Sequence, residues 1–200
     1  TDIQRIDHFR GLAAYWEIDA DAESAKEGRW VKGPGHAFFA ALREKLGDIK
    51  IVAEDLGVQS PEVEALRREE KLPGMRVLEF ALTDNGTARA GSAEEENCVV
   101  YTGTHDNNTA AGWYEKDLNG WTRPRVAEYL GLREECTGAE AAAALIKQAY
   151  MSRARLAVTP LQDVLGLGEE ARMNRPGIAE GNWTWRMPEQ ALTKQKAAWL

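Results

Sequence analysis

The sequence contains few of the residues that bind metals or form disulfides. Its 200 residues include only two cysteines, Cys98 and Cys136, and three histidines. The two cysteines are far apart and match no zinc-ligand or disulfide spacing, so we expect free thiols, as in proteins of a reducing compartment. The sequence therefore predicts no metal site.

Long hydrophobic runs and an excess of basic residues are also missing. No apolar stretch approaches the roughly 18 to 20 residues of a membrane span, and the first residues do not resemble a signal peptide. The net charge is −7 and the isoelectric point is near 5.2. Nucleic acids and anionic membranes require a basic surface, so both are disfavoured as partners. We expect a cytoplasmic protein, and its charge is compatible with a neutral substrate.

What the sequence does contain is an alternation of short apolar runs and helical patterns. Its content of 44% hydrophobic and 28% charged residues is typical of a globular domain. Strands are predicted at 3–9, 49–57, 75–82, 98–106 and 154–168, the last ending at Pro160. Helices are predicted at 11–18, 36–47, 60–72, 107–116, 122–130, 138–152 and 188–200, and a polar loop at 20–35.

Alternating strands and helices predict a parallel sheet with right-handed crossovers. Both an open doubly wound sheet and part of a (β/α)8 barrel fit, but the glycine-rich phosphate loop of dinucleotide-binding sheets is absent. Asp7, Glu54 and Asp106 each lie at the C-terminal end of an apolar run. Barrel active sites are assembled at that end of the strands. The predicted fold class is therefore α/β of the (β/α)8 TIM-barrel type.

Three carboxylates at one barrel mouth predict chemistry on a glycosidic bond. They repel one another unless cations compensate, and Arg5 lies two residues before Asp7, on the same face of the strand. Glycoside hydrolysis and transfer need one ionised carboxylate as nucleophile and one protonated carboxyl as acid. We expect Asp7, beside Arg5, to be the ionised group and Glu54 to hold the proton.

Four stretches carry a resemblance to a known family. RIDHFRG, VAEDLGV, YTGTHDNNT and NRPGIAEGNWTWR resemble, in this order, the signature stretches of the amylomaltases, which are 4-α-glucanotransferases related to the α-amylase barrels. The resemblance covers nearly all 200 residues. It implies that α-1,4-glucan segments are moved between chains through a covalent glucosyl-enzyme with retention of configuration. It also implies that no metal or organic cofactor is needed.

The resemblance also assigns roles to individual residues. It implies that Asp7 is the nucleophile, Glu54 the general acid/base and Asp106 the third carboxylate, which holds sugar hydroxyls. Arg5 would orient Asp7, and His105 would bind a sugar hydroxyl. His8 and Asn182 are weaker candidates for sugar contacts. Among the tryptophans, Trp113, Trp183 and Trp185 are candidates for stacking on sugar faces, and Trp183 is equally compatible with packing in the core.

Other interpretations remain open from the sequence alone. Asp7 and Arg5 could form a structural ion pair only, and His105 next to Asp106 also occurs in metal phosphohydrolases, although these need more histidines than the chain has. An α-glucan hydrolase is the nearest enzymatic alternative, and a non-catalytic barrel fragment is the other. The ratio of chain transfer to glucose release on maltotriose distinguishes a transferase from a hydrolase.

Five strands cannot close an eight-stranded barrel. We therefore expect residues 1–200 to form the C-terminal part of a glycoside-hydrolase-type catalytic barrel, covering about the last five β/α units, with earlier strands and subdomains upstream of Thr1. Unpaired strand edges on such a partial barrel predict self-association. The expected partners are α-1,4-glucans and maltooligosaccharides.

Overall fold

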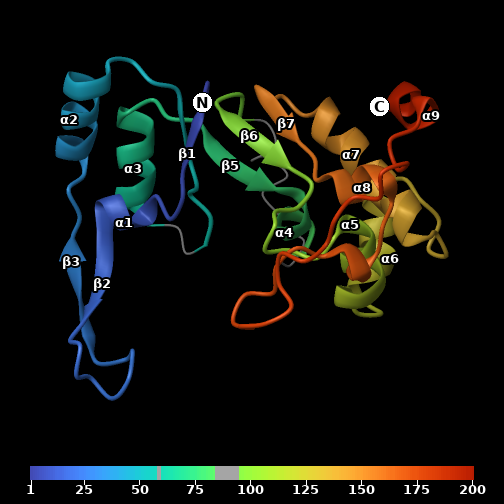
Figure 1. The fold of residues 1–200 in the computed structure, drawn as a ribbon, viewed down its shortest axis with the longest axis horizontal. Helices are drawn as coiled ribbons and strands as arrows, with labels where there is room; N and C mark the ends of the chain where they lie inside the picture. The colour runs from blue at the N-terminus through green and yellow to red at the C-terminus, as the bar shows by residue number, and fades with distance from the viewer. Residues whose placement is uncertain (58–59, 84–94) are drawn as a thin grey trace. The chain divides into compact units, whose positions relative to one another are not determined.

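The computed structural model describes residues 1–57, 60–83 and 95–200. The chain divides into two compact units. The first consists of Thr1–Met75 and Asn97–Val99, and the second of Arg76–Glu96 and Val100–Leu200. Figure 1 shows the elements of each unit in the order of the chain.

The first unit is organised by two short parallel strands, β1 (Gln4–Ile6) and β4 (Ile51–Ala53). Ile6 is the register partner of Ala53, and β4 is buried along its whole length. These strands confirm the predictions at 3–9 and 49–57, although both strands end earlier than their apolar runs. Asp7 and Glu54, the residues that directly follow β1 and β4, therefore lie outside the strands.

Helix α2 (His36–Leu46) begins and ends where the sequence signals predict, and α3 (Pro61–Glu69) begins after Ser60 as predicted but ends three residues before Leu72. The hydroxyl of Ser60 accepts a hydrogen bond from the backbone N–H of Val63 at 3.4 Å, and a proline occupies the first position of α3. Their apolar faces pack with the strands into one core. It contains Phe9, Phe39, Ile51, Ala53, Val63 and Leu66.

The predicted helix at 11–18 is wrong over most of its length, and the predicted loop at 20–35 is interrupted by a strand. Helix α1 covers only Arg10–Ala13, and β2 (Ala14–Ile18) pairs antiparallel with β3 (Gly28–Lys32) in a hairpin (Figure 1). Trp16 lies opposite Trp30, with ring centroids 5.4 Å apart. Aromatic cross-strand pairs stabilise antiparallel strands, and this pair lies too far apart in the sequence for periodicity to reveal it.

Strands β5 (Gly74–Val77), β6 (Cys98–Tyr101) and β7 (Leu156–Val158) form a second sheet in the order β5-β6-β7. They confirm strands within 75–82, 98–106 and 154–168. The second half of the run 75–82 is instead helix α4 (Leu78–Thr83). A short apolar run fits a buried helix as well as a strand, so its period could not distinguish them.

The remaining helices of the second unit follow one another closely. They are α5 (Ala110–Gly112), which continues as a π-helical turn (Trp113–Asp117), then α6 (Thr122–Tyr129), α7 (Gly138–Met151), α8 (Leu161–Leu165), a 3-10 turn (Glu169–Ala171) and α9 (Lys194–Trp199). Helices predicted at 107–116 and 188–200 begin later than expected. In both cases a threonine, Thr109 or Thr193, caps the first turn.

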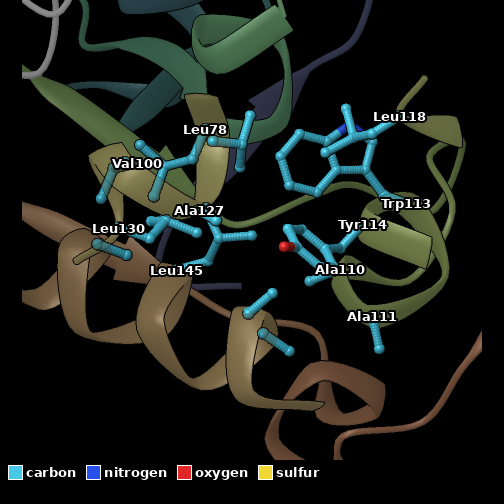
Figure 2. Close-up of a cluster of buried hydrophobic side chains, with 14 residues drawn as sticks. Leu78, Val100, Ala110, Ala111, Trp113, Tyr114, Leu118, Ala127, Leu130 and Leu145 are labelled. Atoms are coloured by element: carbon cyan, nitrogen blue, oxygen red, sulfur yellow. The ribbon is translucent and has the colours of Figure 1, made fainter. Parts of the chain in front are cut away.

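The core of the second unit lies around α7 (Figure 2). Leu145 is fully buried and packs in one cluster with Val100, Trp113 and Tyr114. Alanines on the same face of α7, among them Ala141, are small enough for α5 to approach closely. This core supports the segment between β6 and α5, which carries Asp106.

Helix α7 begins with a capping box, so its start is open to a direct test. The hydroxyl of Thr137 accepts the N–H of Glu140 at 3.2 Å, and the carboxylate of Glu140 accepts the N–H of Thr137 at 2.8 Å. Thr137→Ala should lower the free energy of unfolding by about 1 kcal/mol, measured by urea denaturation. Replacement of the exposed Glu135 by alanine is the control, with an expected change below about 0.5 kcal/mol. Equal losses in both variants would contradict a role for the capping box.

Candidate active site

The pairing of β1 with β4 brings Asp7 and Glu54 to neighbouring strand ends. Each follows the last paired residue of its strand. The N–H of Glu54 donates to the carbonyl of Ile6 at 2.9 Å, and the N–H of Phe9 donates to the carbonyl of Glu54 at 3.1 Å. The backbone therefore ties the two carboxylate-bearing residues together.

The Asp7 carboxylate is oriented by Arg5. Both terminal nitrogens of Arg5, Nη1 and Nη2, donate to Oδ1 of Asp7, at 2.5 and 2.7 Å. Arg5 and Asp7 lie on one face of the chain, as their spacing predicts. The Asp7 side chain is 77% exposed, so its second oxygen, Oδ2, is accessible to a ligand.

The Glu54 carboxylate is held by backbone groups instead. Its Oε2 accepts the N–H of His8 at 2.8 Å, and its Oε1 accepts the N–H of Leu56 at 2.9 Å. His8 has φ +47°, a left-handed conformation that is costly for residues other than glycine. Backbone strain of this kind concentrates at functional sites, and here it directs the His8 N–H to Glu54.

The next residue, Asp55, anchors the strand end from the buried side. It is 4% exposed and forms an ion pair with the buried Arg67 of α3, with Nε and Oδ2 3.1 Å apart. Its Oδ1 also accepts the N–H of Met75 at 2.8 Å. The contacts of the buried Asp55 therefore fix the backbone directly after Glu54.

In the second unit, Asp106 and His105 lie on the turn after β6. Nδ2 of Asn174 donates to Oδ1 of Asp106 at 2.6 Å, and Nη2 of Arg172 donates to the Asp106 carbonyl at 2.8 Å. Nε2 of His105 lies 3.4 Å from Oδ2 of Asp106. Sequence reasoning missed Arg172 and the role of Asn174, although Asn174 is the first residue of the NRPG stretch.

Trp183 stands next to His105, with ring centroids 5.3 Å apart. Both rings line a cavity of about 320 Å³ that also contains Asn108, Asp163 and Arg172 in its wall. Trp183 has φ +61°. It is 51% exposed, so its ring is not buried in the core of this chain.

Asn182 holds the loop that presents Trp183. Its Oδ1 accepts the N–H of Arg175 at 2.9 Å, and its Nδ2 donates to the carbonyl of Ile178 at 2.8 Å. The structure thus assembles two groups of candidate residues, each within one unit. Arg5, Asp7, His8 and Glu54 form the first, and His105, Asp106, Asn182 and Trp183 form the second.

Within residues 1–57, 60–83 and 95–200, no group of three or more His, Cys, Asp or Glu side chains could hold a metal ion. None of the helices there combines the length and the apolarity needed to cross a membrane. Cys98 and Cys136 are both free thiols.

Comparisons with known proteins identify the family of the chain. The model of the family Glyco_hydro_77, described as 4-alpha-glucanotransferase, matches residues 1–193, and the chain belongs to this family. A 4-alpha-glucanotransferase of Thermus thermophilus is 48% identical over 204 residues, and that of Streptococcus pneumoniae TIGR4 is 45% identical over 193 residues. These matches cover 98% and 96% of the chain, but only 40% and 38% of the relatives.

A solved structure shows the same fold. The amylomaltase of Streptococcus agalactiae in complex with acarbose superposes with a TM-score of 0.88 at 34% identity, over 98% of this chain and 39% of that one. The protein is therefore an α/β chain that matches part of an amylomaltase. It spans about two fifths of the length of these relatives.

The Asp55–Arg67 pair is open to a matched test, because Arg68 is its exposed neighbour. Arg67→Met leaves the buried Asp55 carboxylate without this partner and should lower the free energy of unfolding by about 3 kcal/mol or more. Arg68 pairs with Glu64 at the surface, and Arg68→Met should cost less than about 1 kcal/mol. Urea denaturation of both variants measures the difference, and similar losses would show that the buried pair does not anchor the strand end.

Proposed function

We propose that this chain carries the catalytic carboxylates of a 4-α-glucanotransferase that moves α-1,4-glucan segments between chains. The observation that supports it best is the pairing of β1 with β4, which brings Asp7 and Glu54 to adjacent strand ends in a chain of this family. The substrates are α-1,4-glucans and maltooligosaccharides. Acarbose bound to the Streptococcus agalactiae relative supports this substrate class.

The proposed architecture is a (β/α)8 barrel of which residues 1–200 form the C-terminal part, about the last five β/α units. The parallel β1–β4 pair and the helices that follow these strands support it. Barrel active sites lie where the strands end, and Asp7, Glu54 and Asp106 all lie just beyond strand ends.

In the first step Asp7 attacks the anomeric carbon of the donor glucan. A bond forms between the Asp7 oxygen and C1, the bond between C1 and the glycosidic oxygen breaks, and Glu54 gives its proton to that oxygen. The product is a covalent glucosyl-enzyme with inverted configuration at C1. Arg5 directs the Asp7 oxygen for this attack, which requires the two carboxyl groups to lie about 5 to 5.5 Å apart.

In the second step the 4-hydroxyl of an acceptor glucan replaces the carboxylate. The ionised Glu54 takes the hydroxyl proton while the oxygen attacks C1, and Asp7 is released, so configuration is retained overall. The backbone N–H groups of His8 and Leu56 hold the Glu54 carboxyl group in one orientation through both steps. Side chains perform every step, and the mechanism needs no metal or organic cofactor.

The residues of the second unit hold the sugar. Asp106 binds sugar hydroxyls and stabilises the positive charge that develops on the ring, and Asn174 keeps its carboxylate in place. His105 binds a hydroxyl, and the exposed Trp183 stacks on a sugar face. His8 and Asn182 are further candidates for sugar contacts, and Asn182 also shapes the loop before Trp183.

The proposal also includes the location of the protein and its self-association. The free thiols and acidic charge fit a cytoplasmic protein without nucleic-acid or membrane partners. The unpaired edges of a partial barrel favour self-association. Light scattering over a range of concentrations tests the self-association.

The activity is tested with maltotriose, using the 200-residue chain and a chimera that adds the unmatched part of the Thermus thermophilus relative. We expect the chimera to produce a ladder of longer maltooligosaccharides, seen by chromatography. Asp7→Ala and Glu54→Gln should each reduce the rate by about a thousandfold or more, because each removes a group that takes part in bond exchange. The control is Asp19→Ala, which removes an exposed carboxylate of the hairpin. An unchanged ladder with Asp7→Ala would refute the nucleophile.

Hydrolysis is the alternative activity, in which water instead of a glucan hydroxyl attacks the glucosyl group on Asp7. The ratio of longer products to free glucose from maltotriose distinguishes the two activities. Glucose without longer products would identify a hydrolase. If neither the 200-residue chain nor the chimera forms any product, residues 1–200 are a non-catalytic barrel fragment.

A further inference from the structure

Two carboxyl groups lie buried in the second unit, outside the residues assigned so far to the reaction. Glu79, on α4, is 1% exposed, and Asp163, on α8, is 2% exposed. Buried carboxyl groups are costly unless they are hydrogen-bonded or neutral. Their position close to the turn that carries His105 and Asp106 therefore requires an explanation.

Asp163 has the hydrogen bonds that an ionised carboxylate needs. The hydroxyl of Thr102 donates to its Oδ2 at 2.6 Å, and the N–H of Ala110 donates to its Oδ1 at 2.8 Å. Burial raises the pKa of Asp163, while these two bonds oppose the rise. Thr102 lies before the turn and Ala110 lies after it. Asp163 therefore links the two ends of the segment that contains His105 and Asp106.

Glu79 has fewer partners. Its Oε1 accepts no hydrogen bond from the part of the chain that the structure describes. Burial raises the pKa of Glu79 well above its usual value, and the charges of Asp163 and Asp117 raise it further. Arg172 and a hydrogen bond with Asn107 act in the opposite direction. Two neighbouring carboxyl groups in a dry environment do not both ionise, and Glu79, with fewer donors, is the one that stays neutral.

Through Asn107, Glu79 reaches the turn itself. Oδ1 of Asn107 accepts both the N–H and the hydroxyl of Thr104, at 3.0 and 2.7 Å. The Thr104 hydroxyl oxygen in turn accepts the N–H of Asp106 at 3.3 Å. Asn107 thus closes the turn from 104 to 107, and its side chain is a hydrogen-bond partner of the Glu79 carboxyl group. Both side chains lie next to Gly103, because a Cβ atom there would be 2.7 Å from Oε1 of Glu79 and 3.6 Å from Cβ of Asn107.

Gly103 shows how closely Glu79 packs against this turn. A Cβ atom at position 103 would lie 2.7 Å from Oε1 of Glu79. Any larger residue there would displace the carboxyl group. The N–H of Glu79 also donates to the carbonyl of Thr102 at 3.4 Å, so backbone and side chain of Glu79 both contact the entry of the turn.

We propose that Glu79 is a positioning residue, a neutral carboxyl group that acts through Asn107 to fix the turn presenting His105 and Asp106. The effect on catalysis rests on the proposed function, whereas the effect on the turn does not. A role for Glu79 cannot be read from the sequence, since it lies in a run that the apolar pattern assigns to a strand.

The charges around Glu79 give the proposal a definite pH dependence. The groups that face it are Asp163 from α8, Asp117 from the π-helical turn and Arg172 from the segment after the 3-10 turn. An ionised Glu79 would add a third negative charge to those of Asp163 and Asp117, with Arg172 as the cation that faces them. The stability that neutral Glu79 provides is fully present below its unfolded pKa and is lost as the pH rises through its raised folded pKa.

The test uses Glu79→Gln, which keeps the shape and stays neutral, and Glu79→Ala, which removes the contact. Urea unfolding of the 200-residue chain between pH 5 and pH 10 should show a decline in stability as the pH rises above the usual range of a glutamate, and Glu79→Gln should diminish this decline. The backbone amide NMR signals of residues 104–107 should keep their positions in Glu79→Gln and move in Glu79→Ala. Leu145→Ala is the control for a plain loss of core packing, and it should lower stability equally at every pH.

Activity in the maltotriose chimera gives the catalytic readout. Glu79→Gln should keep kcat within about twofold, whereas Glu79→Ala should lower it about tenfold or more with a smaller change in KM, since a small misplacement of reacting groups is costly. Unmoved amide signals in Glu79→Ala, or a Glu79→Gln variant as impaired as Glu79→Ala, would overturn the proposal. If the chimera transfers no glucan while the amide signals move as expected, the proposed function fails and the positioning of the turn stands.

Discussion

The parallel pairing of β1 with β4 is the constraint on which the candidate site depends. It aligns Ile6 with Ala53, and the next residue of each strand is a carboxylate. A slip of one residue would turn the side chains of a strand to its opposite face, so register and chemistry are set together. The hydrogen bonds of Ile6 and Phe9 with the Glu54 backbone fix that register from both sides. Phe9, fully buried in the core, prevents the segment from sliding.

The three proposed catalytic carboxylates are oriented by three different kinds of donor. A guanidinium binds one oxygen of Asp7, backbone N–H groups bind both oxygens of Glu54, and a side-chain amide binds Asp106. In each case the donors fix the orientation of the carboxylate.

The parts of the fold that the sequence predicts are those decided locally. Helices α2, α3 and α7 follow from periodicity and caps within their own segments, and strand ends with carboxylates indicated Asp7, Glu54 and Asp106. The hairpin of β2 and β3 depends on Trp16 meeting Trp30, a contact between separate segments. Arg67, Asn174 and Glu79 escaped notice for the same reason, because each acts on a residue brought near it only by folding.

The buried pair of Asp55 and Arg67 predicts that positions 67 and 68, although adjacent in the sequence, tolerate substitution very differently. Replacement of one charge alone removes a charged partner from the other inside the protein, so descendants of this chain should retain both or exchange both in a correlated way. Arg68, which pairs with Glu64 at the surface, has no such obligation and should drift among polar residues. Two adjacent positions are therefore constrained differently. Position 67 is constrained by the buried carboxylate that it contacts, and position 68 only by its exposure to water.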